Sequence, residues 1–109
     1  MRIWDLPPEK LCKKHLLGEH SELHAIWSII TNGKKGYSFH PEVIRWKGKL
    51  KALYLKHEEI AHEMKKRGCK HNSPLNILFA TGKDKQNKLI DSISKQKMIL
   101  KNKDCKCKF

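Results

Sequence analysis

Long apolar runs are absent from this 109-residue chain, and no stretch approaches the ~18–20 uninterrupted apolar residues that a membrane-spanning helix needs. The opening stretch MRIWDLPPEKL also lacks the apolar core of a signal peptide. We therefore expect a cytoplasmic protein with no membrane partner. An apolar content of 39% is enough for one modest core, so we expect a single domain over residues 1–109.

Acidic residues are scarce: the chain has eleven Asp and Glu but twenty-four Lys and Arg, which gives a formal net charge of +13. The basic residues recur from Lys10 to Lys108 rather than forming one tail. Such a spread is typical of a folded protein that lies along DNA or RNA. A lysine-biased genome would give the same composition without any such function.

The chain has four cysteines, Cys12, Cys69, Cys105 and Cys107, and their spacing does not form two paired motifs. In the expected reducing compartment they are predicted to be thiols rather than disulfides. The terminal C-K-C has a metal-ligand spacing, but no second paired motif accompanies it. Its role is left open.

Alternating strand patterns and internal repeats are absent too, and helical spacing dominates. Prolines, the Asn32-Gly33 stop signal and Gly68 divide the chain into helices, with Ser38 or His40 expected near the second N-cap. Gly48 is expected either to bend the second helix or to mark its true start. The predicted fold is an all-α, compact single domain of three main helices over residues 9–31, 41–68 and 84–101, followed by a flexible basic tail over 102–109.

Several familiar catalytic patterns are missing: no Ser-His-Asp order, no Gly-rich phosphate loop and no H-E-x-x-H motif. The stretch KHLLGEHSELHAIW, residues 14–27, is nevertheless rich in His and Glu. His20 and His24 form an i,i+4 pair that would need a third ligand for zinc, such as His57, His62 or Cys69. We expect no metal and no cofactor.

A second stripe of the same helix carries His15, Glu19, Glu22 and Ile26, at steps of three and four residues. Both glutamates lie at the edge of the apolar arc, where a solvated carboxylate is not normally found. For Glu19 we expect pairing with a lysine of another helix. A half-buried carboxylate beside a histidine also suits acid/base or cation-stabilising work on a sugar-phosphate.

The α-amine of Met1 is a candidate nucleophile. Its reference pKa is ~7.7–8.0, against ~10.4 for lysine, so a larger fraction is neutral at pH 7. A neutral amine can attack an electrophilic carbon and form an imine. Ile3, Trp4 and Leu6 offer apolar anchors that would hold the N-terminal segment in place.

The stretches MRIWDL, KHLLGEHSELHAIW, NGKKG and KLKALYLKHEEIAHEMKKRG together resemble the pyrimidine-dimer DNA glycosylases of the phage endonuclease V type, over roughly residues 1–75. The resemblance implies an N-terminal segment packed between helices. It also implies a bifunctional enzyme, a DNA glycosylase and AP lyase, with Met1 as nucleophile and Glu22 as the catalytic glutamate. The partner implied is double-stranded DNA with a lesion or abasic site, bound by a monomer.

Carried over by position, Arg2 and His15 would hold the phosphate or sugar beside the lesion. This chain has Ser21 and Ala25 where the phage enzyme has arginines, so the resemblance does not fix the preferred lesion. The rival interpretation is a non-enzymatic, basic nucleic-acid-binding module, zinc-stabilised through His20 and His24. The complete set of expected DNA contacts is Arg2, Lys13, Lys14, His15, Ser21, Lys34 and Lys35.

Overall fold

The protein is described here from a computed structural model, which describes residues 2–33, 36, 39–69, 74–103 and 107. Within these residues the chain is helical, and its β pairing is limited to an isolated antiparallel bridge between Lys49 and Gly82. The predicted all-α fold is confirmed. The elements, in chain order, are η1 (Pro8–Lys10), α1 (Lys13–Thr31), α2 (Pro41–Trp46), α3 (Leu50–Lys66), η2 (Ile77–Phe79) and α4 (Ile93–Lys101).

The first helix begins later than predicted. The expected start at Glu9 is wrong, because residues 8–10 form a short 3₁₀ turn and the chain is then extended at Leu11 and Cys12. Leu11 is buried in the core, so the extended link places an apolar side chain inward before α1 starts. The predicted end is confirmed, since α1 stops at Thr31 and Gly33 has φ +60°.

The second predicted helix is two helices. Lys47 is extended and Gly48 has φ +75°, a left-handed conformation that glycine adopts without strain, so the chain turns between α2 and α3. Gly48 therefore precedes the true start of the long helix. His40 is the N-cap of α2, where its Nδ1 accepts from the Glu42 amide at 3.1 Å.

The third predicted helix is shorter than expected, because only Ile93–Lys101 is helical. Residues 81–88 instead pair with the junction of α2 and α3: Lys83 N donates to Gly48 O at 3.0 Å, and the Gln86 side chain accepts from Lys49 Nζ at 2.7 Å. These bonds hold the segment against the junction in a non-helical conformation. Ser92 caps α4 by accepting from Lys95 N.

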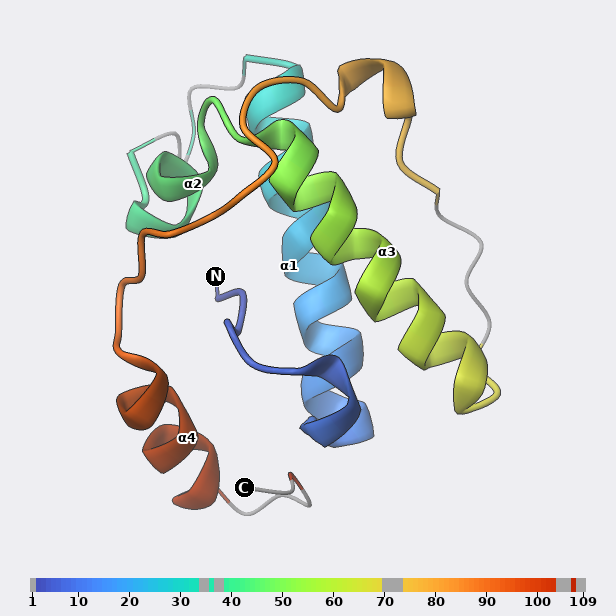
Figure 1. Ribbon diagram of the computed structural model, residues 1–109, viewed down its shortest axis with the longest axis vertical. Helices are drawn as coiled ribbons and strands as arrows, with labels where there is room; N and C mark the ends of the chain where they lie inside the picture. Colours follow the sequence, from blue (N-terminus) through green and yellow to red (C-terminus); the bar gives the residue numbers. More distant parts are fainter. Residues whose placement is uncertain (1, 34–35, 37–38, 70–73, 104–106, 108–109) are drawn as a thin grey trace.

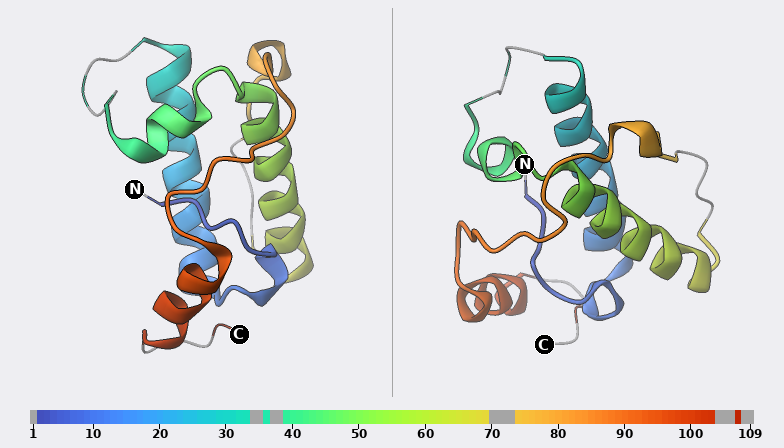
Figure 2. Two further views of the ribbon diagram at one scale, coloured as in Figure 1. Left: turned by 60° about the vertical axis from the view of Figure 1, so that its left-hand side comes forward. Right: turned by 45° about the horizontal axis from the view of Figure 1, so that its top comes forward.

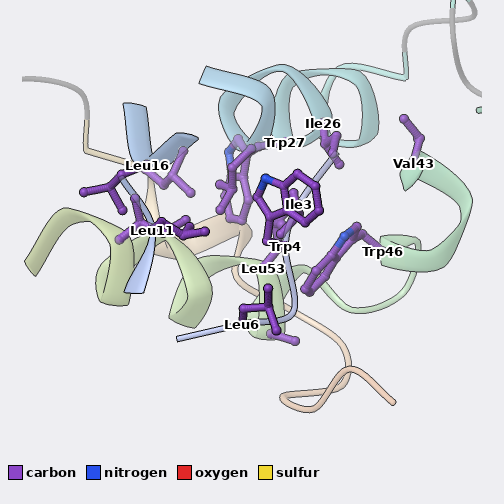
Figure 3. Packing of buried hydrophobic residues seen from close by; sticks show 14 of the residues in the cluster. Ile3, Trp4, Leu6, Leu11, Leu16, Ile26, Trp27, Val43, Trp46 and Leu53 are labelled. Carbon is purple, nitrogen blue, oxygen red and sulfur yellow. The ribbon is translucent and has the colours of Figure 1, made fainter. Parts of the chain in front are cut away.

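The core forms where α1 and α3 cross, with α2 beside the C-terminal half of α1 and α4 near the N-terminal segment (Figures 1 and 2). The N-terminal segment enters this core, as the resemblance implied. Ile3, Trp4 and Leu6 are buried and lie among side chains of α1, α2 and α3 (Figure 3). In the described part of the chain, no helix is long and apolar enough to cross a membrane.

Candidate active site

The N-terminal segment lies on the stripe of α1 that carries His15, Glu19 and Glu22. The Trp4 ring meets the His15 ring edge-on, with centroids 6.1 Å apart, and the Trp4 backbone lies next to the Glu19 carboxylate. The structure thus brings the expected anchors together with the acidic stripe. Met1, the expected nucleophile, lies outside the described residues.

Glu19 is the most unusual group on the stripe, because its side chain is fully buried. The expected lysine from another helix is present: Lys56 Nζ of α3 lies 3.8 Å from Glu19 Oε1. Neither carboxylate oxygen has a hydrogen-bond partner among the described residues. Burial raises the pKa of Glu19 to about 8, although Lys56 and the Trp4 backbone act in the opposite direction. At neutral pH this group is therefore mainly a neutral acid.

Glu22 differs from Glu19 in its environment. It lies one turn further along α1 and is only half-buried, so a ligand at the surface can reach its carboxylate. The neighbouring Ser21 is exposed and Ala25 is half-buried. The two glutamates of the stripe thus differ in burial: Glu19 is enclosed, whereas Glu22 is accessible.

The N-terminal segment is held by a buried arginine that sequence reasoning missed. Arg45 of α2 binds Glu42 at 2.6 Å, Asp5 at 3.0 Å, the Ile3 carbonyl at 2.9 Å and the Lys88 carbonyl at 2.9 Å. The i,i+3 spacing of opposite charges in PEVIR was visible in the sequence, but its burial was not. Arg45 therefore ties the chain start, α2 and the segment before α4 together.

Asp5 is bound a second time, by a side chain of α4. Its backbone amide donates to Gln96 Oε1 at 2.8 Å, and Gln96 Nε2 donates to Asp5 Oδ2 at 3.1 Å. Gln96 is itself buried. The direction of residues 2–6 is consequently fixed from both α2 and α4.

Arg2, an expected DNA contact, is already paired. Its Nη1 lies 2.8 Å from Asp91 Oδ2, and its guanidinium lies over the Trp4 ring at 4.9 Å. Hydrogen bonds from Arg2 and Lys95 lower the pKa of Asp91, so this carboxylate is charged at neutral pH. The Arg2 side chain remains 36% exposed, which leaves it accessible to a phosphate.

The other expected DNA contacts are distributed over the start of α1. Lys13 and Lys14 are exposed on its first turn, whereas Lys34 and Lys35 lie outside the described residues. His15 Nδ1 lies 3.1 Å from Cys12 Sγ and 3.3 Å from Cys107 Sγ, so a phosphate contact from this ring falls to Nε2. Burial, Lys103 and Lys14 lower the pKa of His15, which favours the neutral ring at pH 7.

Two groups of described side chains have the composition and spacing to hold a metal ion. One is Cys12, His15 and Cys107, and the other is His20, His24 and His57. In each group the candidate ligand atoms lie within 4.8 Å of one another. The second group lies on α1 and α3, on a different face of α1 from Glu22.

The comparison with protein-family models agrees with the resemblance seen in the sequence. No curated protein and no solved structure matches the chain. A family model described as pyrimidine dimer DNA glycosylase matches residues 1–77, which is most of the chain and includes the N-terminal segment, α1, α2 and α3. The chain belongs to the pyrimidine dimer DNA glycosylase family.

Proposed function

We propose that the protein is a glycosylase with coupled AP lyase activity, in which the α-amine of Met1 is the nucleophile and Glu22 the catalytic carboxylate. The amine attacks C1′ of the damaged nucleotide, and the bond from C1′ to the base breaks with its electron pair on the base, which takes up a proton. The sugar ring opens to give an imine. Loss of a C2′ proton then expels the 3′ phosphate and cuts the strand.

The observation that carries this proposal is the burial of Ile3 and Trp4 along the acidic stripe of α1. Trp4 contacts His15 and lies at Glu19, while the Ile3 carbonyl is bound by Arg45 of α2, which lies beside the C-terminal half of α1. Traced from Trp4 back to Ile3, the segment therefore runs along α1 from its first turns toward its middle, where Glu22 lies. An amine used as a nucleophile needs such fixed positioning, because orientation supplies much of the rate.

The contrast between the two glutamates supports Glu22 as the catalytic group. Glu19 is enclosed and mainly neutral at pH 7, so it supplies little negative charge to a developing cation. Glu22 is accessible on the same stripe. Its carboxylate would stabilise positive charge at C1′ and assist the proton transfers around the imine.

The charge of the chain supports DNA as the substrate. Arg2 is partly exposed in the N-terminal segment, and Lys13 and Lys14 are exposed in the first turn of α1. Cations placed along a duplex bind its phosphates and release counterions, so binding should weaken steeply with salt. A lesion or abasic site is cheaper to open than intact duplex, which favours extrusion of the damaged nucleotide. The family match does not favour the rival, non-enzymatic interpretation.

Trapping with borohydride on abasic-site DNA tests the mechanism, because reduction turns an imine into a stable amine. The chain with a free Met1 amine should give a covalent protein–DNA adduct, and a chain extended at its N-terminus should not. Glu22→Gln should slow strand cleavage by about 10²–10⁴-fold with little loss of binding. Glu9→Gln, an exposed glutamate of η1, is the control and should cleave normally. An adduct of equal yield from the extended chain would refute the Met1 amine.

The same assay addresses the lesion. Parallel reactions on ultraviolet-irradiated DNA and on abasic-site DNA separate the glycosylase step from the lyase step. Cleavage of both substrates is the expected result. Cleavage of abasic DNA alone would leave the lyase chemistry in place and refute pyrimidine dimers as the substrate.

A further inference from the structure

Three histidine rings converge at the crossing of α1 and α3. His24 Nε2 lies 3.1 Å from His20 Nε2 and 3.1 Å from His57 Nε2. The ring centroids are 4.5 to 5.2 Å apart. His57 is fully buried, whereas His20 and His24 are half-buried. The same kind of nitrogen from each ring thus points to one small volume.

Hydrogen bonding alone accounts poorly for this arrangement. A neutral imidazole nitrogen carries either one N–H or one lone pair, so His24 Nε2 can make one well-directed hydrogen bond. It has two imidazole nitrogens at 3.1 Å. A shared cation that accepts all three lone pairs removes the conflict.

The distances fit a zinc ion. Zinc binds imidazole nitrogen at ~2.0–2.1 Å in tetrahedral geometry, which places two ligand nitrogens about 3.3 Å apart. The two observed Nε2–Nε2 separations are 3.1 Å, and one candidate ligand atom from each of the three rings lies within 4.8 Å of the other two. Three imidazoles form a ligand set that zinc uses, with a fourth position left for water or another donor.

A carboxylate orients one of the three imidazole rings and sets which of its nitrogens carries the proton. His57 Nδ1 lies 3.1 Å from Glu58 Oε1, so the carboxylate accepts the Nδ1 proton and leaves the lone pair on Nε2. Carboxylate–histidine–zinc chains of this kind orient the ligand and raise its basicity. The exposed Glu58 carboxylate also offsets part of the charge that the ion brings.

We propose that His20, His24 and His57 bind a zinc ion that fastens α1 to α3. His57 is 33 positions beyond His24, so the ion joins helices that the chain connects only through α2. At 100° per residue, Glu22 is two positions from both His20 and His24 and so lies about 160° around α1 from each. The ion therefore holds the helix that carries Glu22 without contacting it, and the proposal does not depend on the imine chemistry.

The test must separate this site from the Cys12, His15 and Cys107 group. The starting protein is the full chain with Cys12→Ser and Cys107→Ser, purified, stripped with a chelator and loaded with zinc or cobalt alone. We expect one zinc ion per chain and a tetrahedral cobalt spectrum without sulfur-to-cobalt charge-transfer bands. Zinc at about a hundredfold over its Kd should raise the Tm by roughly 10 °C.

Single substitutions then identify the ligands. In this background His24→Gln or His20→Gln should remove the bound zinc and the Tm rise, whereas His62→Gln, an exposed histidine also on α3, should retain both. Retention of zinc by His24→Gln would overturn the proposal, as would absence of zinc from the starting protein.

A measurement on the wild-type chain covers the case in which the variants fail to fold. X-ray absorption at the zinc edge of the loaded protein should show a shell of three imidazole rings. Zinc bound only through sulfur ligands, or through water alone, would refute the histidine site.

Discussion

Replacing Glu19 by glutamine should stabilise the protein at neutral and alkaline pH while leaving it unchanged in acid. Glutamine has nearly the shape of glutamic acid and carries no charge at any pH. The wild-type carboxyl is enclosed, its oxygens have no hydrogen-bond partner among the described residues, and its pKa is raised from 4.5 to about 8. The substitution therefore removes a titration and little else.

The sign and size follow from proton linkage. Between pH 4.5 and pH 8 the folded protein holds a proton on Glu19 that the unfolded chain has released. The free energy of unfolding then falls as pH rises, by about 1.4 kcal/mol per pH unit from this group. From pH 4.5 to pH 7 the loss is roughly 3 kcal/mol, which corresponds to roughly 10 °C in Tm. The Glu19→Gln variant has no such titration, so its free energy of unfolding does not fall for this reason.

Urea denaturation and thermal melting at several pH values between 4 and 8 measure the effect. The quantity of interest is the difference between variant and wild type, because other carboxylates titrate in both. This difference should be near zero at pH 4 and should grow with pH in favour of Glu19→Gln. Glu9→Gln, at an exposed position, should show no such growth. Parallel pH profiles for wild type and Glu19→Gln would refute the buried neutral acid.

Other structural features give sharper single measurements. Arg45→Met should lower the free energy of unfolding by about 3–5 kcal/mol in urea titrations, because it removes the ion-pair partner of the buried Glu42 carboxylate and of the half-buried Asp5; a loss below about 1 kcal/mol would contradict this. Gly82→Ala places a Cβ 2.2 Å from a backbone oxygen, whereas Gly33→Ala meets nothing within 4 Å, so only the former should cost well over ~1 kcal/mol beyond the strain of its positive φ. Equal losses would show that the contact is irrelevant. Changing Lys13 and Lys14 together to Gln should reduce the slope of log K against log salt for DNA binding by about 1.8, and an unchanged slope would remove both from the interface.

The sequence predicted the helices better than the segments that connect them. Helical spacing and the stop signals at Asn32-Gly33 and Gly68 located the C-terminal ends of the two long helices, because these signals are local. The segment 84–91 was predicted helical from the same spacing, yet the Gln86 side chain bonds to Lys49 and to the Arg45 carbonyl, and the Lys88 carbonyl accepts from the Arg45 side chain. These contacts join residues that are far apart in the sequence, and they override the local preference for helix. Helical spacing alone therefore does not predict them.

The candidate site shows the same division. The stripe of His15, Glu19 and Glu22 follows from helix geometry, and the structure places the N-terminal segment on it. The difference in burial between the two glutamates depends on what covers α1, which spacing does not reveal. Arg45 was missed for a related reason, since its partners come from three separate parts of the chain.

The histidines of α1 illustrate how one fold contact changes a chemical interpretation. His20 and His24 alone lack a third ligand, and the sequence offered His57, His62 and Cys69 without a means of choosing. The crossing of α1 and α3 selects His57, whose nitrogen lies 3.1 Å from that of His24. Helix α1 then has three faces: one packs into the core, one carries Glu22, and one carries the histidines toward α3. A metal ion on the third face would fix the position of the second, so metal loading and the positioning of Glu22 should be linked through the rigidity of a single helix.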